Sequence, residues 1–285
     1  MTDTMLTTAA SAALALALDR LLGEPTRAHP LVGFGTLAQR LESMLNQPSG
    51  RRKRLAGIGA VLGLVGLPVL LLAALPRIPL VDAVILYFTL GWRSLGEHAS
   101  AVQTALDRDD LAAAREAVAR MVSRDCDQLD ATHVAGATVE SVLENGNDAV
   151  FGALFWYAVA GAPGALAYRL ANTLDALWGY RSDRYARFGW AAARLDDLLN
   201  LLPARLTALA YALVGDTRRA LACWRTQARA WKSPNAGPVM AAGAGALGLR
   251  LGGPARYRGK VEERPPLGAG ELPTAVDIGR ARALI

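Results

Sequence analysis

The run LAGIGAVLGLVGLPVLLLAAL, residues 55–75, decides the fold class of this chain. Its 21 residues carry no charge, and an α-helix of that length, rising about 1.5 Å per residue, covers the roughly 30 Å of hydrocarbon in a bilayer. The basic block RRKR at 51–54 precedes it directly, and positive residues beside a span stay on the cytoplasmic side. The run therefore predicts a membrane-spanning helix, with residues 23–54 in the cytoplasm and the PRIP link at 76–79 on the far side.

The composition agrees with a membrane protein that has substantial polar loops. Hydrophobic residues make up 52% of the 285 residues, charged residues make up 20%, and the mean hydropathy is +0.22. The net charge of +6 comes without a basic and aromatic array, which argues against nucleic acid as a partner. Cys126 and Cys223 lie far apart and form no CxxC motif, so we expect free thiols in a reducing compartment.

Two more spans and one water-facing region are expected in the first half. Residues 1–22 form the first span, because the apolar stretch 5–18 lacks the basic flank of a cleaved signal peptide. Residues 80–96 form a third span that returns the chain to the cytoplasm. Residues 93–148 carry 11 of the 25 carboxylates, so residues 97–148 are predicted to be a cytoplasmic helical region.

The second half is predicted to hold broken or short membrane helices over residues 149–252 and a tail over 253–285. The uncharged run 149–168 is interrupted by GAPG at 161–164. A straight span there would export the arginines that follow, whereas a broken or re-entrant helix pair turning at GAPG would keep them inside. No strand alternation is visible. We therefore expect one membrane-embedded domain, 1–285, with the fold of an all-α polytopic integral membrane protein.

Carboxylates gather where the chain is expected to meet lipid. In VESVLENGND (139–148), Glu140, Glu144 and Asp148 recur every four residues and share one helix face if the helix extends that far. A solvated face is the simplest interpretation. The stripe leads into an apolar run, however, and unpaired carboxylates near lipid are costly unless a cation joins them. Magnesium or a substrate ammonium would serve.

A second acidic motif is AARLDDLLNLLPARL, residues 192–206. The simplest interpretation is an ion pair with Arg194 or Arg205. Adjacent helical residues point about 100° apart, so Asp196 and Asp197 cannot share one partner symmetrically. We expect one aspartate to pair structurally while the other faces a site.

Other polar residues have ordinary explanations beside functional ones. Arg124 and Asp125 lie in an aspartate-rich stretch typical of a capped turn. Asn172 and Asp175 lie one helical turn apart among Trp, Tyr and Arg side chains that suit a membrane interface. His29, beside a proline, is of a kind that is usually structural.

Together these stretches resemble the adenosylcobinamide-phosphate synthase family, the membrane proteins of cobalamin assembly. The resemblance runs in order along nearly the whole chain, through LDRLLGEPTRAHPLVGFG (18–35), GWRSLGEHA, SRDCDQLD, VESVLENGND, NTLDALWGY, RYARFGWAAARLDDLLNLLPARL, SPNAG, LGLRLGGPARY and VDIGRARALI.

The resemblance implies an ATP-dependent ligase that joins a carboxylate of adenosylcobyric acid to (R)-1-amino-2-propanol O-phosphate, or a similar amino-alcohol phosphate, and gives adenosylcobinamide phosphate. ATP and Mg²⁺ would be co-substrate and metal, and the corrinoid would be a substrate. Expected partners are the lipid bilayer and other membrane proteins of cobalamin assembly, at the cell inner membrane with the active face cytoplasmic. A membrane transporter and a noncatalytic regulatory or scaffold protein stay open as alternatives.

Site residues follow from the motifs and the resemblance together. We expect Asp197→Asn to abolish amide formation. The candidate catalytic residues are Asp196, Asp197, Asp175 and Glu144; those for substrate or phosphate are Arg124, Arg194, Arg181, Lys232, Asn172, Asn145, Tyr180 and His29; those for metal are Asp148, Glu140 and Asp125.

Overall fold

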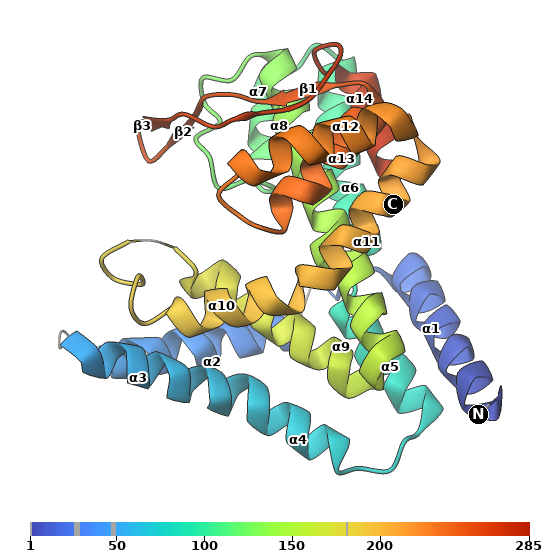
Figure 1. Cartoon of the computed structure of the whole chain (residues 1–285), viewed down its shortest axis with the longest axis vertical. Helices are drawn as coiled ribbons and strands as arrows, with labels where there is room; N and C mark the ends of the chain where they lie inside the picture. Colours follow the sequence, from blue (N-terminus) through green and yellow to red (C-terminus); the bar gives the residue numbers. More distant parts are fainter. Residues whose placement is uncertain (1, 26–28, 47–49, 181) are drawn as a thin grey trace. The chain divides into compact units, whose positions relative to one another are not determined.

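The computed structural model describes residues 2–25, 29–46, 50–180 and 182–285 and is mostly helical (Figure 1). This confirms the predicted all-α class. The helices are α1 Thr2–Leu22, α2 Pro30–Leu45, α3 Gly50–Val61, η1 Leu62–Gly66, α4 Leu67–Ala73, α5 Pro79–Thr89, α6 Trp92–Asp107, α7 Leu111–Val118, α8 Ala131–Gly146, η2 Asn147–Phe151, α9 Gly152–Trp178, α10 Trp190–Leu199, α11 Leu201–Val214, α12 Thr217–Gln227, η3 Ala228–Ala230, α13 Ala236–Leu247 and α14 Ala275–Arg282.

The chain forms two compact units, each built from two separate stretches. The first unit combines Met1–Gly91 with Asp148–Asn200, and the second combines Trp92–Asn147 with Leu201–Ile285. That a single membrane-embedded domain holds the whole chain stays a prediction.

Three helical stretches among the described residues are long and apolar enough to cross a membrane: Met5–Leu22, Arg52–Ala73 and Ala131–Trp178. The first two match the spans expected at 1–22 and 55–75. Helices α10 and α11 add a fourth candidate if the pair counts as one span. Large side chains of η1 and α4, such as Leu62 and Leu70, are exposed in the structure, as a lipid-facing surface requires.

The third span expected at residues 80–96 is not one continuous helix. Helix α5 ends at Thr89, and its 11 residues span only about 16 Å. Leu90 has extended backbone (ψ 156°), and the Gly91 N–H donates to the carbonyl of Ala149 at 3.0 Å. The chain leaves the helix there because Gly91 bonds to η2 rather than to its own preceding turn.

The expected break at GAPG is observed inside α9. Gly161 has φ 67° and ψ −155°, a conformation that glycine adopts readily and other residues avoid. Pro163 lacks an N–H, and a Cβ at Gly161 would collide with the guanidinium of Arg77. Figure 1 shows the chain turning back within α9. Two helical halves therefore replace one straight span over 149–168.

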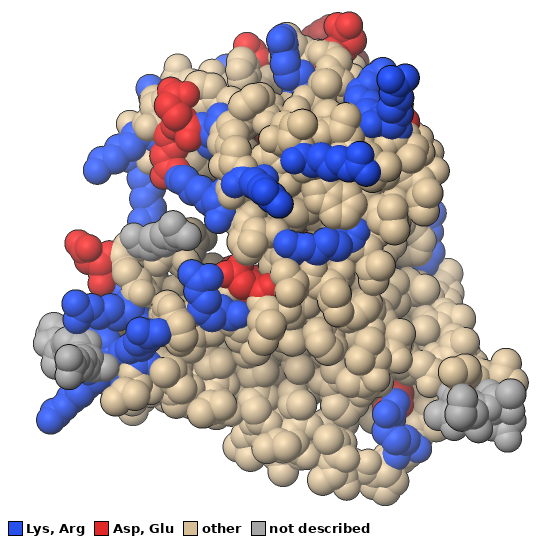
Figure 2. All heavy atoms as spheres, in the orientation of Figure 1, with Lys and Arg blue, Asp and Glu red and all other residues tan. Residues whose placement is uncertain are grey.

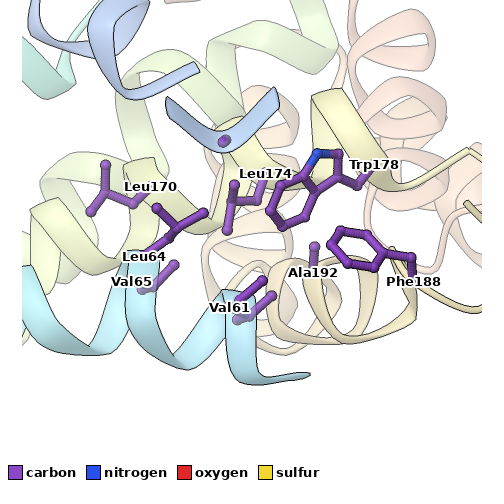
Figure 3. Packing of buried hydrophobic residues seen from close by; sticks show 10 residues of the cluster. Val61, Leu64, Val65, Leu170, Leu174, Trp178, Phe188 and Ala192 are labelled. Atoms are coloured by element: carbon purple, nitrogen blue, oxygen red, sulfur yellow. The ribbon is translucent and has the colours of Figure 1, made fainter. Parts of the chain in front are cut away.

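Two apolar clusters hold the first unit together. One joins α3 and η1 to α9 and α10, and Trp178 meets Phe188 edge to face at 5.0 Å within it (Figure 3). The other packs α1 and α5 against α9, where Tyr157 and Tyr168 are buried. Helix α9 thus has neighbours along its length, which fixes the direction of its polar side chains.

In the second unit, α13 is surrounded by other elements and every residue from Ala236 to Leu247 is buried. Its small residues allow close packing, since a Cβ at Gly243 would collide with Leu143. Residues 250–268 add two antiparallel strand pairs that sequence analysis did not anticipate. Strands β1 (Arg250–Gly252) and β4 (Pro266–Gly268) pair, as do β2 (Ala255–Tyr257) and β3 (Lys260–Glu262). Strands of three residues are too short to show alternation.

Candidate functional site

The first unit gathers carboxylates around one asparagine. The amide nitrogen of Asn172, on α9, donates to Asp196 Oδ1 at 3.2 Å and lies 3.4 Å from Asp148 Oδ2. Asn200 also donates to Asp196 Oδ1, at 3.1 Å, and accepts a hydrogen bond from the buried Tyr168 hydroxyl at 2.9 Å. Five residues from η2, α9, α10 and the C-cap of α10 are therefore linked through the side-chain amides of Asn172 and Asn200. We call Asp148, Asp175 and Asp196 the acidic cluster.

Asp175 belongs to the cluster through electrostatics. It interacts unfavourably with Asp148, Asp196 and Asp197. Asp197 itself pairs with Arg194 at 3.0 Å, three residues earlier on α10. Asp197 thus has the structural ion pair that the sequence allowed for one of the two aspartates, and Asp196 is the one that joins the amide network. Mutual repulsion among carboxylates favours any cation that binds there.

In the second unit, Glu140 is held by two arginines. Its Oε2 accepts from Arg124 and, at 2.9 Å, from Arg264, while its Oε1 accepts from the Gly252 N–H at 2.8 Å. The three side chains are only 5%, 11% and 9% exposed for Glu140, Arg124 and Arg264. We call these three residues the arginine clamp. Burial acts to lower the pKa of Arg264, but the nearby Glu140 acts more strongly in the opposite direction. The net pKa is raised, so the guanidinium keeps its charge.

Two adjoining cavities meet at the arginine clamp. One, of about 300 Å³, is lined by the clamp together with Glu144, Asn145 and Trp231 among others. The other, of about 400 Å³, is lined by the clamp, His133 and the backbone of Gly252 and Gly253 among others. The smaller cavity thus brings together four residues that sequence analysis selected: Arg124, Glu140, Glu144 and Asn145.

Several predicted site residues have local structural partners. Asp125 accepts hydrogen bonds from the N–H groups of Arg258 (3.0 Å) and Gly259 (2.7 Å), which hold the turn between β2 and β3. Lys232 pairs with Glu262. His29 caps α2, where its Nδ1 accepts from the Leu31 N–H at 3.2 Å. Burial lowers the pKa of His29, in keeping with a neutral ring that accepts.

The remaining predicted residues are placed as follows. Tyr180 is exposed after the end of α9, and Asn145 donates to the carbonyl of Ser141 at 2.9 Å. Arg181 lies outside the described residues.

The predicted metal ligands do not form a ready-made cage. Within the described ranges, no three His, Cys, Asp or Glu side chains come together as a metal-binding group. The carboxylate of Glu140 accepts hydrogen bonds from the two arginines of the clamp, and that of Asp125 accepts them from backbone N–H groups. Asp148, at the acidic cluster, is the predicted ligand that has carboxylate neighbours.

Sequence analysis missed three residues that complete these sites and one arginine on α9, the helix that carries Asn172. Arg264 lies in the predicted tail, 124 residues from Glu140, and no local pattern connects the two. Tyr168 ends an apolar run in the sequence, and Asn200 is of a residue type common at helix ends, so neither stood out as a site residue. Arg169 follows Tyr168, and its buried Nε has no hydrogen-bond partner among the described residues. A charged residue inside a candidate span is itself a signal of function, and it could have singled out Arg169.

Comparison with known proteins covers almost the whole chain. The model of the family described as "CobD/Cbib protein" matches residues 12–285. The chain belongs to the CobD/Cbib family. A protein of Stutzerimonas stutzeri named "Cobalamin biosynthesis protein CobD" is 62% identical over 275 residues, which are 95% of this chain and 91% of that protein.

Two further relatives carry the same name. The Chromobacterium violaceum protein is 58% identical over 95% of this chain and 90% of its own length. The Mycobacterium tuberculosis protein is 42% identical over 94% of this chain and 88% of its own length. No solved structure matches the chain. Membership of the CobD/Cbib family supports a role in cobalamin biosynthesis, and the apolar helices support a membrane location.

Proposed function

We propose that this protein is an ATP-dependent amide ligase, which condenses a side-chain carboxylate of adenosylcobyric acid with an amino-alcohol phosphate such as (R)-1-amino-2-propanol O-phosphate. The observation that carries the proposal is the family match over residues 12–285. The geometry supports it with a cavity lined by two arginines and two glutamates, Arg124, Arg264, Glu140 and Glu144.

The arginine clamp suits the phosphate of the amino alcohol. Two guanidinium groups and one carboxylate leave a net positive charge, and guanidinium forks match phosphate oxygens. Glu144 lines the same cavity of about 300 Å³. The amine and phosphate of this substrate are separated by two carbons and one oxygen, so a cavity of that size can hold both. Glu144 is our candidate for the base that takes the proton from the amine.

The acidic cluster suits a cation. Magnesium prefers carboxylate oxygens, and proteins commonly supply only one or two of them, with the rest of its ligands coming from water and substrate phosphates. The absence of a three-acid cage among the described residues is compatible with that habit. Asp148 and Asp196, bridged by Asn172, would hold the ion. When bound, it would compensate the repulsion among the carboxylates of the acidic cluster.

The test is a reaction with purified components. Protein in detergent receives adenosylcobyric acid, aminopropanol phosphate, ATP and Mg²⁺, and mass spectrometry measures the condensed amide. We expect product only when ATP is present and a strong loss of rate in Glu144→Gln. Amide formed without ATP would contradict the activation step, and no amide under any condition would favour a transporter or a noncatalytic protein.

A further inference from the structure

A larger pocket in the second unit has no role in the site described so far. It has a volume of about 880 Å³ and is formed by α11, α12, η3, the loop after η3 and the start of α13. We call it the tryptophan–arginine pocket. Its lining includes Arg205, Arg225, Arg229, Lys232, Trp224 and Trp231.

The charges of this pocket are one-sided. Four of its lining residues are cationic, and none of the described lining residues is acidic. Figure 2 shows Lys and Arg side chains gathered over the part of the surface where α12 and α13 lie in Figure 1. An excess of cations around one concave space creates a positive potential, which concentrates anions there.

Two of the cations are engaged and two are available. Arg205 donates to Asn235 and, at 3.0 Å, to the carbonyl of Pro234, and Lys232 pairs with Glu262. Arg225 and Arg229 are exposed and form no ion pair in the described part of the chain. They lie four residues apart, at the end of α12 and in η3, a spacing at which helical side chains are neighbours.

Flat apolar surface accompanies the cations. Trp224 and Trp231 are both half-buried and line the pocket. Stacking of a nucleobase on an aromatic side chain contributes about 1–3 kcal/mol. Guanidinium groups beside indole rings therefore suit a ligand with both phosphates and a flat ring.

The pocket adjoins the candidate site. Trp231 lines both this pocket and the cavity that contains Glu144 and the arginine clamp, and Arg264 of the clamp lies 5.3 Å from the centre of the Trp231 ring. A phosphate chain that starts in the larger pocket can reach toward the smaller cavity without leaving the second unit.

We infer that the tryptophan–arginine pocket binds a nucleoside triphosphate, with Arg225 and Arg229 on the phosphates and Trp224 against the base. This assignment rests on the proposed ATP-dependent reaction. It specifies residues that neither the motifs nor the reaction itself selects, since of this pocket only Lys232 was expected to contact phosphate.

Calorimetry with a non-hydrolysable ATP analogue tests the assignment. Wild type in detergent is titrated with adenylyl imidodiphosphate, with tripolyphosphate and with adenosine. We expect the Arg225→Ala/Arg229→Ala variant to bind the analogue at least about tenfold more weakly, because each lost hydrogen bond to a charged group is worth a factor of ten or more. Trp224→Leu should weaken the analogue but leave tripolyphosphate unchanged.

Arg218→Ala is the matched control, because Arg218 is exposed on the same helix and does not line the pocket. Thermal unfolding checks that each variant folds. Equal affinity of the double variant and the control would overturn the assignment. Tripolyphosphate binding as tightly as the analogue would overturn the role of the base. Displacement of the analogue by anionic lipid in nanodiscs would reassign the pocket to a lipid headgroup.

The outcomes separate this assignment from the ligase proposal. Analogue binding that depends on Arg225 and Arg229, in a protein that never forms the amide, would leave the pocket assigned and the ligation refuted. The double variant could instead form the amide at the wild-type rate and bind the analogue with wild-type affinity. That result would overturn the assignment of the pocket but not the ligase proposal.

Discussion

Asp196 and Asp197 are neighbours in the chain with different surroundings. The 100° rotation between adjacent helical residues turns Asp197 toward Arg194 on its own helix and Asp196 toward Asn172 and Asn200. The amide groups hold the Asp196 side chain without supplying a counter-charge. A carboxyl group crowded by other carboxylates is suited to bind a cation, which would compensate their repulsion, whereas one with an arginine partner is suited to packing.

Asp196→Asn should therefore abolish amide formation or reduce it by orders of magnitude. The variant should still insert into the membrane and should have the same unfolding free energy as wild type. Loss of the charge removes the attraction for a cation but keeps the shape of the side chain. The measurement is the rate of amide formation against Mg²⁺ concentration. Asp183→Asn, exposed in the loop before α10, is the control. A variant of Asp196 with wild-type rate and magnesium dependence would refute the role.

Glu140→Gln should destabilise the second unit by about 3 kcal/mol, because it leaves two buried arginines without a counter-charge. Unfolding by urea in detergent measures the change. Glu116→Gln is the matched control, since Glu116 pairs with Arg120 on the surface and is 75% exposed, where ion pairs contribute little. Equal stability of the two variants would show that the arginine clamp is not a structural requirement.

At the scale of elements, interruptions of helices determine which residues meet. The break at Gly161 lets the two halves of α9 run in different directions, and the π-helical turn η2 carries Asp148. Because α5 ends at Thr89, the Gly91 N–H is able to donate to the carbonyl of Ala149. Continuous helices would present polar side chains at fixed 3.6-residue intervals, and such helices could not bring Asp148, Asn172 and Asp196 together.

Gly161→Ala should reduce the thermal stability of the protein markedly. Alanine at φ 67° is strained, and its Cβ would collide with Arg77. Gly63→Ala is the control, because a Cβ there meets nothing within 4 Å and the helix favours alanine. A melting temperature for Gly161→Ala equal to that of Gly63→Ala would show that the break does not need glycine.

Helix α14 begins with a capping box between Thr274 and Asp277, which gives stability that depends on pH. Burial acts to raise the pKa of Asp277, but hydrogen bonds from Thr274 and Arg280 outweigh it, so the folded pKa lies below 3.8. A lowered pKa means that the contribution is present above 3.8 and is lost as pH falls through the folded value.

Asp277→Asn should therefore be less stable than wild type near neutral pH, and the difference in unfolding free energy should shrink below pH 3.8. Urea unfolding over a series of pH values measures it. Asp107→Asn, exposed at the end of α6, should show no such trend. A difference that stays constant with pH would contradict a capping role for the carboxylate.

At the scale of the whole molecule, orientation in the membrane stays a prediction from charge. Residues 23–54 should be cytoplasmic and the link at 76–79 should lie on the far side. The native thiols will not obscure a labelling test, because Cys126 and Cys223 are buried and burial raises the pKa of both.

In intact spheroplasts, a membrane-impermeant maleimide should modify Ile78→Cys and spare Ser43→Cys until the membrane is opened. Both positions are exposed in the structure, so accessibility differs only through the bilayer. Gel shift of the modified protein is the readout. The reverse pattern would invert the topology and place the candidate active face outside the cytoplasm.

The sequence by itself determined the class of the protein, its first two candidate spans, the break at GAPG and most residues of the two candidate sites. These properties depend on local features: a run long enough for the bilayer, a glycine beside a proline, charges next to apolar segments. Tertiary structure alone decided which of two adjacent aspartates joins a network, where α5 ends, and that Arg264 meets Glu140. Contacts between residues on different elements, such as Asn172 and Asp196 or Glu140 and Arg264, depend on packing, and no local pattern encodes them.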